Sequence, residues 1–173
     1  MGTRGITQVI DSNGQTVVAQ YGQWDHYPEG QGLNILSFLT SSHNIVEQLE
    51  KALFKCYFAT DSELDEMSKP FVTPDGMMTM DNSDKFAVMY PSLTRNTGSD
   101  ILKVVTYSTG RVPLSNQIDF IEDDLMCEGI YTIDFQTRLF VSQYGGRRVV
   151  FALDKLPTPE LYLNEFAKEE VMA

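Results

Sequence analysis

The feature that most constrains the fold is an Asn13-Gly14 pair between two short segments rich in β-branched residues. An Asn-Gly pair in this position favours a two-stranded antiparallel hairpin, because both residues tolerate the positive φ angles of a tight turn. We therefore predict strands over residues 5–10 and 15–21, with residues 11–14 between them. A sheet begins at the start of the chain.

The middle of the chain has the spacing of helices. Apolar residues recur at helical intervals directly after Gly32, and a second apolar stripe follows, with Ser41-Ser42 as its expected N-cap. Ser99-Asp100 is a comparable cap further along the chain. The predicted helices cover residues 33–39, 45–53, 61–67, 82–90 and 101–105.

The last third of the chain returns to strands. Residues 131, 133 and 135 are apolar and alternate with polar residues, which is the pattern of a half-buried strand. The predicted strands cover residues 118–121, 129–135, 138–144 and 149–153, and a terminal helix begins within residues 157–160. We expect a single α+β domain over residues 1–173, with an N-terminal β-hairpin, central helices, a C-terminal antiparallel strand meander and a terminal helix.

The charge of the chain is strongly acidic. Its 24 acidic and 13 basic residues give a formal net charge of −11, which disfavours direct binding to duplex nucleic acid. Counted from Asp61, the sixth and twelfth positions hold Glu66 and Val72, so a calcium loop is excluded. The two acidic clusters of the middle region have two interpretations. They form a solvated face that aids solubility, or they act as a decoy that occupies the basic, nucleic-acid-binding groove of a partner. The candidate partner-binding residues are Asp61, Glu63, Asp65, Glu66, Glu122, Asp123 and Asp124.

Residues 20–32 differ in composition from the rest of the chain. They include the only tryptophan, two tyrosines, one of the two histidines and three glycines, between a predicted strand and a predicted helix. Backbone N–H groups at a helix N-terminus attract anions, and Trp24 and Tyr27 can stack on a planar ring. The segment therefore predicts a site for a planar anionic ligand. An aromatic, glycine-rich turn that packs over the core is the structural alternative.

The predicted ligand site combines hydrogen-bonding side chains with three arginines. Amide and carboxylate groups would bind the edge of the ligand, and the arginines would bind its charge. No catalytic residue is assigned. The candidate ligand-binding residues are Arg4, Gln20, Tyr21, Gln23, Trp24, Asp25, His26, Tyr27, Gln31, Arg147 and Arg148.

Motifs for catalysis and metal binding are weak or absent in the sequence. The P-loop and dinucleotide-binding glycine patterns are missing, and His26 and His43 lack the HExxH spacing. Cys56 and Cys127 form no CxxC pair and are expected to be buried free thiols in a reducing cell. We expect no cofactor and no metal. An acid–base role of Asp25 or His26 on a nucleotide or phosphoester stays open.

The chain lacks the patterns of a membrane protein. No uninterrupted apolar run approaches the ~18–20 residues of a transmembrane helix, and the N-terminus lacks the layout of a signal peptide. We expect a protein of the host-cell cytoplasm with no membrane partner. Residues 15–21 and the last strand offer edges through which two copies would pair, so a homo-oligomer stays open.

Four motifs carry a resemblance to a known family. They are MGTRG at residues 1–5, YGQWD at 21–25, YPEGQG at 27–32 and CEGIYTID at 127–134. Together they resemble a family of small proteins encoded by phages, prophages and bacteria, in which glycine usually stands at the position of His26. The resemblance brings no catalytic residues. It implies a phage-type origin, and counter-defence is a common role of small accessory phage proteins.

Three hypotheses of function follow from these observations. The leading one is a non-enzymatic counter-defence protein that captures a small nucleotide-like or anionic ligand at residues 20–32. The second is a protein inhibitor whose acidic middle region blocks the basic groove of a host nuclease or other defence protein, as an anti-CRISPR-like decoy. The third is an enzyme acting on a nucleotide or phosphoester.

Overall fold

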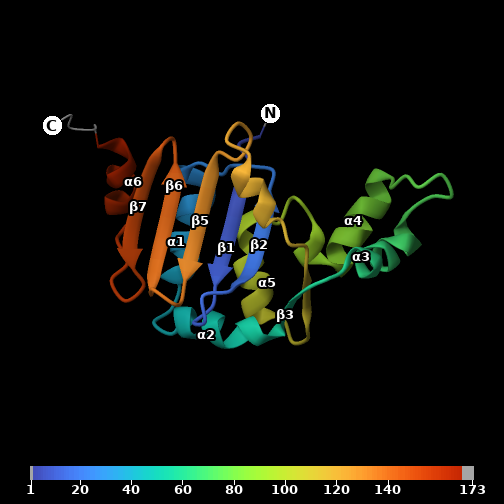
Figure 1. Cartoon of the computed structure of the whole chain (residues 1–173), viewed down its shortest axis with the longest axis horizontal. Helices are drawn as coiled ribbons and strands as arrows, with labels where there is room; N and C mark the ends of the chain where they lie inside the picture. Colours follow the sequence, from blue (N-terminus) through green and yellow to red (C-terminus); the bar gives the residue numbers. More distant parts are fainter. Residues whose placement is uncertain (1, 169–173) are drawn as a thin grey trace.

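A five-stranded mixed sheet with the strand order β2-β1-β5-β6-β7 forms the centre of the structure (Figure 1). The computed structural model describes residues 2–168. The pairs β1–β2, β5–β6 and β6–β7 are antiparallel, whereas β1 and β5 run parallel side by side. The strands are β1 (Gly5–Ile10), β2 (Thr16–Gly22), β5 (Gly129–Asp134), β6 (Leu139–Tyr144) and β7 (Arg147–Ala152).

The N-terminal hairpin forms at the predicted turn. Gly14 has a φ angle of 82°, a conformation that suits glycine. The carboxylate of Asp11 accepts hydrogen bonds from the backbone N–H groups of Asn13 and Gln15 at 2.9 and 3.0 Å, which closes the turn. The predicted hairpin is confirmed, and so is the C-terminal antiparallel meander.

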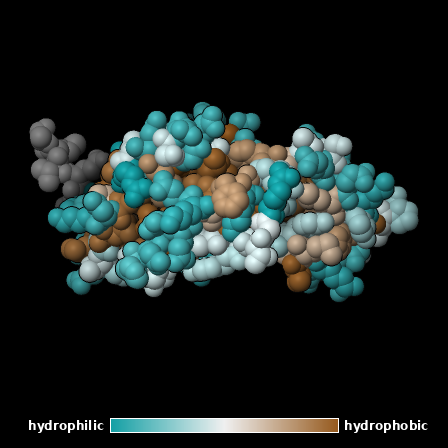
Figure 2. Space-filling model, turned by 90° about the horizontal axis from the view of Figure 1, so that it is seen from below, coloured by the Kyte–Doolittle hydropathy of each residue, from teal (hydrophilic) through white to brown (hydrophobic). Residues whose placement is uncertain are grey.

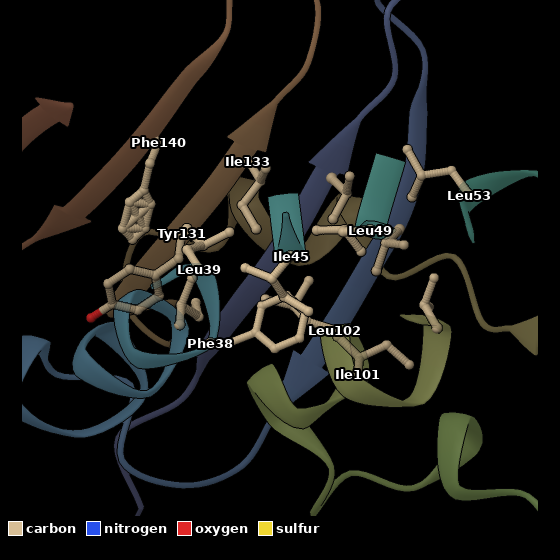
Figure 3. Packing of buried hydrophobic residues seen from close by; sticks show 14 of the residues in the cluster. Phe38, Leu39, Ile45, Leu49, Leu53, Ile101, Leu102, Tyr131, Ile133 and Phe140 are labelled. Atoms are coloured by element: carbon tan, nitrogen blue, oxygen red, sulfur yellow. The ribbon is translucent and has the colours of Figure 1, made fainter. Parts of the chain in front are cut away.

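Helices cover one face of the sheet and enclose the core. α1 and α5 lie behind the sheet, α2 crosses its lower end, and α6 lies beside the edge strand β7 (Figure 1). These helices are α1 (Leu33–Leu39), α2 (Ile45–Ala52), α5 (Ile101–Tyr107) and α6 (Pro159–Ala167). Figure 3 shows the buried side chains that meet between helices and strands, including Phe38, Leu39, Ile45, Leu49, Ile101, Leu102, Tyr131, Ile133 and Phe140.

A second, two-stranded parallel sheet and an arm complete the α+β domain. The sheet pairs β3 (Cys56–Phe58) with β4 (Val112–Leu114). The arm, defined here as residues 59–90, projects from the body of the molecule (Figure 1). It contains α3 (Asp61–Ser68) and α4 (Met80–Met89), neither of which has a buried residue.

The structure corrects the prediction of a strand at residues 118–121. This segment is the 3-10 helix η6 (Ile118–Glu122). The residue that pairs with the edge of β2 is Gln117 instead. Its backbone N–H donates to the Ala19 carbonyl at 3.1 Å, and its side-chain Oε1 accepts from the Tyr21 N–H at 2.9 Å. The chain then turns, and the ring of Phe120 packs edge-on against Tyr21.

The helix caps differ from the predicted ones in two places. The residue before α2 is Asn44, and the hydroxyl of Ser41 instead donates to the Phe38 carbonyl at the end of α1. The turn Gly98–Asp100 forms a short 3-10 helix before α5, so no side chain caps that helix. The helix at residues 82–90 begins earlier than predicted, at Met80, because Thr79 caps it.

Candidate functional site

Three glycines lie side by side at one end of the sheet and make room for His26, Gly5 and Gly22 for its ring and Gly129 for its backbone carbonyl. Gly5 pairs with Gly22 on β2 and with Gly129 on β5. A Cβ atom on Gly22 would lie 2.0 Å from His26 Cε1, and one on Gly5 would lie 2.5 Å from His26 Cδ2. The absence of side chains at these three positions therefore allows the segment that follows β2 to pack against the sheet.

Hydrogen bonds fix His26 on this glycine surface. Its backbone N–H donates to the Thr3 carbonyl at 3.0 Å, and its carbonyl accepts from the Tyr131 hydroxyl at 2.7 Å. Nδ1 lies 3.0 Å from the Trp24 carbonyl, while the buried Nε2 has no partner among the described residues. Burial lowers the pKa of His26 to about 4, so the ring is neutral at pH 7.

The backbone of residues 23–32 is hydrogen-bonded within the protein. The N–H groups of Gln23, Gly30 and Gln31 donate to the carbonyls of Arg95, Tyr27 and Asp25 at 3.1, 3.0 and 2.7 Å. The π-helix η1 (Pro28–Gly32) leads directly into α1. These three amide groups are thus engaged in holding the segment together.

The side chains of this segment also contact one another. Trp24 is 48% exposed, and its Nε1 donates to Asn96 Oδ1 at 3.1 Å. Gln31 donates to the Trp24 carbonyl at 3.2 Å and accepts from the Ser99 N–H at 3.1 Å. The Tyr21 hydroxyl donates to Gln23 Oε1 at 2.5 Å, and the Tyr27 hydroxyl donates to Asp25 Oδ1 at 3.2 Å. The negative charge of Asp25 raises the pKa of Tyr27.

The three predicted arginines lie just before β1 and on β7. Arg4 Nη2 lies 3.2 Å from the sulfur of Met126, and Arg147 Nη1 donates to the Glu165 carbonyl at 2.9 Å. Arg147 lines a shallow cavity of about 290 Å³ that also includes Glu29 of the 20–32 segment. Arg148 is exposed on β7.

A larger cavity of about 590 Å³ lies between the sheet edge and the arm. We call it the Gln20 cavity, because the β2 residue Gln20 lies in its wall. Gln20 is 2% exposed; its Nε2 lies 3.4 Å from the Thr94 carbonyl, and its buried Oε1 has no partner among the described residues. An unpaired buried carbonyl oxygen is costly unless a donor reaches it. The cavity is lined on the body side by Gln20, Ser92, Leu93, Thr94, Arg95, Asn96, Ser115 and Gln117, and on the arm side by Leu64, Asp65, Ser68, Met78, Met80, Ser83, Asp84 and Phe86.

The Gln20 cavity connects to the 20–32 segment through two contacts. The Gln23 N–H donates to the Arg95 carbonyl, and the Trp24 indole donates to Asn96. Arg95 is the one basic residue among its lining residues, and Asp65 is one of the acidic residues that the sequence singled out. As ligand-binding residues, sequence reasoning identified Gln20 but missed Arg95 and Asn96, since no local pattern marks them.

The two acidic clusters lie on different elements. One is on α3, where the Glu63 carboxylate forms a capping box with Thr60 and Glu66 lies 3.8 Å from Lys69. The other follows η6, where Asp123 accepts from the backbone N–H of Met126 at 3.0 Å. Part of the acidic charge therefore has a local structural role. The cluster members are Asp61, Glu63, Asp65 and Glu66 on α3, and Glu122, Asp123 and Asp124 after or at the end of η6.

No family model, curated protein or solved structure matches the chain. Within residues 2–168, no three His, Cys, Asp or Glu side chains are grouped as metal ligands. None of the helices in that range has the length and apolar character to cross a bilayer.

Proposed function

We propose that the protein is a non-enzymatic binding protein that captures a nucleotide-like ligand in the Gln20 cavity. Two observations carry this proposal: a cavity of about 590 Å³ with Arg95 and two carboxylates among its lining residues, and, in the side chain of Gln20 in its wall, a buried Oε1 without a partner among the described residues. Cavities of roughly 300–1,000 Å³ accommodate small organic ligands. The resemblance of the N-terminal motifs to phage-encoded proteins supports counter-defence as the purpose of this capture.

The lining residues favour a ligand with hydrogen-bond donors and one anionic group. The carboxylates of Asp65 and Asp84 are acceptors, which suit the N–H groups of a nucleobase, and a shift of the buried Gln20 side chain towards the cavity would add its Oε1. Arg95 is the basic group available for a phosphate. Phe86 adds an aromatic surface. A nucleoside phosphate combines all these features, and it also fits the planar anionic ligand expected from the sequence.

Binding without turnover is supported by the chemistry of the wall. No histidine or cysteine is among its lining residues. The hydroxyl of Ser92 donates to the Pro113 carbonyl at 2.6 Å, which occupies its proton in the structure. His26, the acid–base candidate of the sequence, is fully buried against the glycine surface.

Thermal-shift and calorimetric titration with nucleoside monophosphates and cyclic dinucleotides tests the proposal. A bound ligand raises the unfolding temperature of the wild-type protein. The substitution Gln20→Met removes the acceptor at similar volume and should weaken binding about tenfold, the loss expected for one hydrogen bond in a dry site. Gln143→Met, on β6, is the matched control and should bind as the wild type does.

Two further comparisons locate the ligand. Arg95→Gln should weaken binding of a nucleotide more than binding of the corresponding nucleoside, because only the nucleotide carries a phosphate. If Trp24→Ala abolishes binding and Gln20→Met does not, the ligand lies at the exposed face of the 20–32 segment instead. Absence of a thermal shift with every ligand of the panel argues against capture of a nucleotide.

A further inference from the structure

We infer that the outer surface of the arm docks onto a protein partner that presents basic side chains around an apolar groove. The first observation is that the arm carries large apolar side chains in solvent. Met77, Val88 and Met89 are 66%, 83% and 61% exposed. Figure 2 shows apolar and hydrophilic side chains intermixed on the arm, at the right of the view.

These side chains are mostly in solvent, whereas aromatic rings pack inside the arm. Phe86 lies 5.4 Å from Phe71 and 5.2 Å from Tyr90, measured between ring centroids. Neither α3 nor α4 has a buried residue. Because methionine is flexible and polarizable, exposed methionines suit a surface that adapts to a partner.

The second observation is the charge of the arm. It has seven acidic and two basic residues, so its net charge is 2 − 7 = −5. Both lysines are already paired: Lys85 lies 2.9 Å from Asp81, and Lys69 lies 3.8 Å from Glu66. The acidic residues outside these two pairs therefore give the arm its net negative charge. The seven acidic residues are Asp61, Glu63, Asp65, Glu66, Asp75, Asp81 and Asp84.

Charge complementarity identifies the class of partner. A second copy of this chain carries the same formal charge of −11 and would be repelled, as would nucleic acid or an anionic membrane. A protein with a basic rim is attracted, and its apolar groove would cover the exposed valine and methionines. The arm therefore fits a basic protein groove better than any of these other surfaces.

The docking surface, formed by Met77, Val88 and Met89 with the acidic Asp61, Asp75 and Asp81, excludes Asp65 and Asp84, which line the Gln20 cavity. On α4 the cavity is lined by Met80, Ser83, Asp84 and Phe86. Asp81, Lys85 and Val88 follow one another at intervals of four and three residues and so lie along a different face of the helix. The inference does not rest on the proposed ligand, and the two can fail separately.

Fluorescence anisotropy with a labelled amphipathic helical peptide of lysine and leucine tests the docking surface. We expect this peptide to bind the whole protein more tightly than an oligolysine of equal charge, and more weakly as salt is raised. The double substitution Val88→Ser and Met89→Ser should weaken peptide binding about tenfold, because it removes the apolar contact. Substituting Asp61→Asn and Asp75→Asn, which lie outside the two lysine pairs and the cavity wall, should reduce the salt dependence.

The control variant is Leu125→Ser, which removes an exposed apolar side chain outside the arm and should leave binding unchanged. Circular dichroism and thermal unfolding establish that each variant is folded, and Gln20→Met should bind the peptide as the wild type does. Three results would overturn the inference: equal affinity for oligolysine, equal loss in Leu125→Ser, or no peptide binding. A dimer in light scattering that dissociates in the Val88 and Met89 variant would assign the surface to a second copy instead.

Discussion

The imidazole ring of His26 occupies the space that a side chain on Gly22 would need. A Cβ atom at Gly22 would lie 2.0 Å from His26 Cε1 and 3.1 Å from the Cα of Gly98, so both neighbours would have to move. Gly98 has a φ angle of 50° and lies at the start of the turn before α5. The glycine at the end of β2 thus couples the 20–32 segment to the helical layer.

We predict that Gly22→Ala lowers the free energy of unfolding by about 3 kcal/mol, because overpacking a closed site forces strain on its neighbours. Gly110→Ala is the matched control. A Cβ atom at Gly110 meets nothing within 4 Å, and that substitution should change stability by less than about 0.5 kcal/mol. Urea unfolding of both variants measures the difference. Equal stability of the two variants would contradict the close contact with His26.

The buried state of His26 predicts a specific dependence of stability on pH. Its pKa is about 4 in the folded protein and 6.5 when unperturbed, so between these values the unfolded chain binds a proton that the folded protein does not. Stability should therefore fall as the pH is lowered from 6.5 towards 4. The 2.5-unit difference corresponds to a total loss of about 3 kcal/mol.

Unfolding free energies measured at several pH values test this, with His26→Gln as the variant. This variant should be less stable at pH 7 but should lose the part of the pH dependence that comes from the imidazole. His43→Gln, at an exposed histidine, is the control variant for the loss of an imidazole. A His26→Gln profile parallel to that of the wild type between pH 6.5 and 4 would show that the ring is protonated in the folded state.

Tyr131 provides the other support of the 20–32 segment. Its hydroxyl donates to the His26 carbonyl at 2.7 Å, and its side chain is fully buried, which raises its pKa. We predict that Tyr131→Phe costs about 1–3 kcal/mol, because the buried carbonyl loses its donor. Tyr107→Phe, at an exposed tyrosine, should have no comparable effect. Chemical unfolding of the two variants gives the comparison, and a neutral Tyr131→Phe would mean that water replaces the hydroxyl.

The elements that the sequence predicted well are those fixed by local chemistry. The Asn13-Gly14 turn determines the first hairpin from four neighbouring residues, and the spacing of apolar residues after Gly32 marks α1. The parallel pairing of β1 with β5 joins segments at opposite ends of the chain, and no local pattern specifies it. Residues 118–121 were misassigned because a short apolar run has no period that separates a strand from a 3-10 turn.

The candidate site was predictable only in part, for the same reason. The unusual composition of residues 20–32 identified a segment that is indeed held in a special environment, by Gly5, Gly22 and Gly129. The Gln20 cavity is built from segments near residues 20, 64–86, 92–96 and 115–117, which meet only in the folded chain. Arg95 therefore has no signature in the sequence that distinguishes it from other surface arginines.

The two cysteines give a final prediction, on chemical reactivity. Burial raises the pKa of both Cys56 and Cys127 to about 11, and the nearby carboxylates of Asp123 and Glu128 act in the same direction on Cys127. Since the thiolate is the reactive form, alkylation of both residues by iodoacetamide at pH 8 should be about a hundredfold slower than for a thiol of pKa 9.

Mass spectrometry of the two alkylated peptides measures each rate separately. The rates in the folded protein should rise about tenfold for each pH unit between pH 8 and 10, because the thiolate fraction rises in that proportion below the pKa. The protein unfolded in urea is the control and should react rapidly at pH 8. Equal rates in the folded and unfolded protein at either cysteine would show that its thiol is not shielded by the surrounding residues.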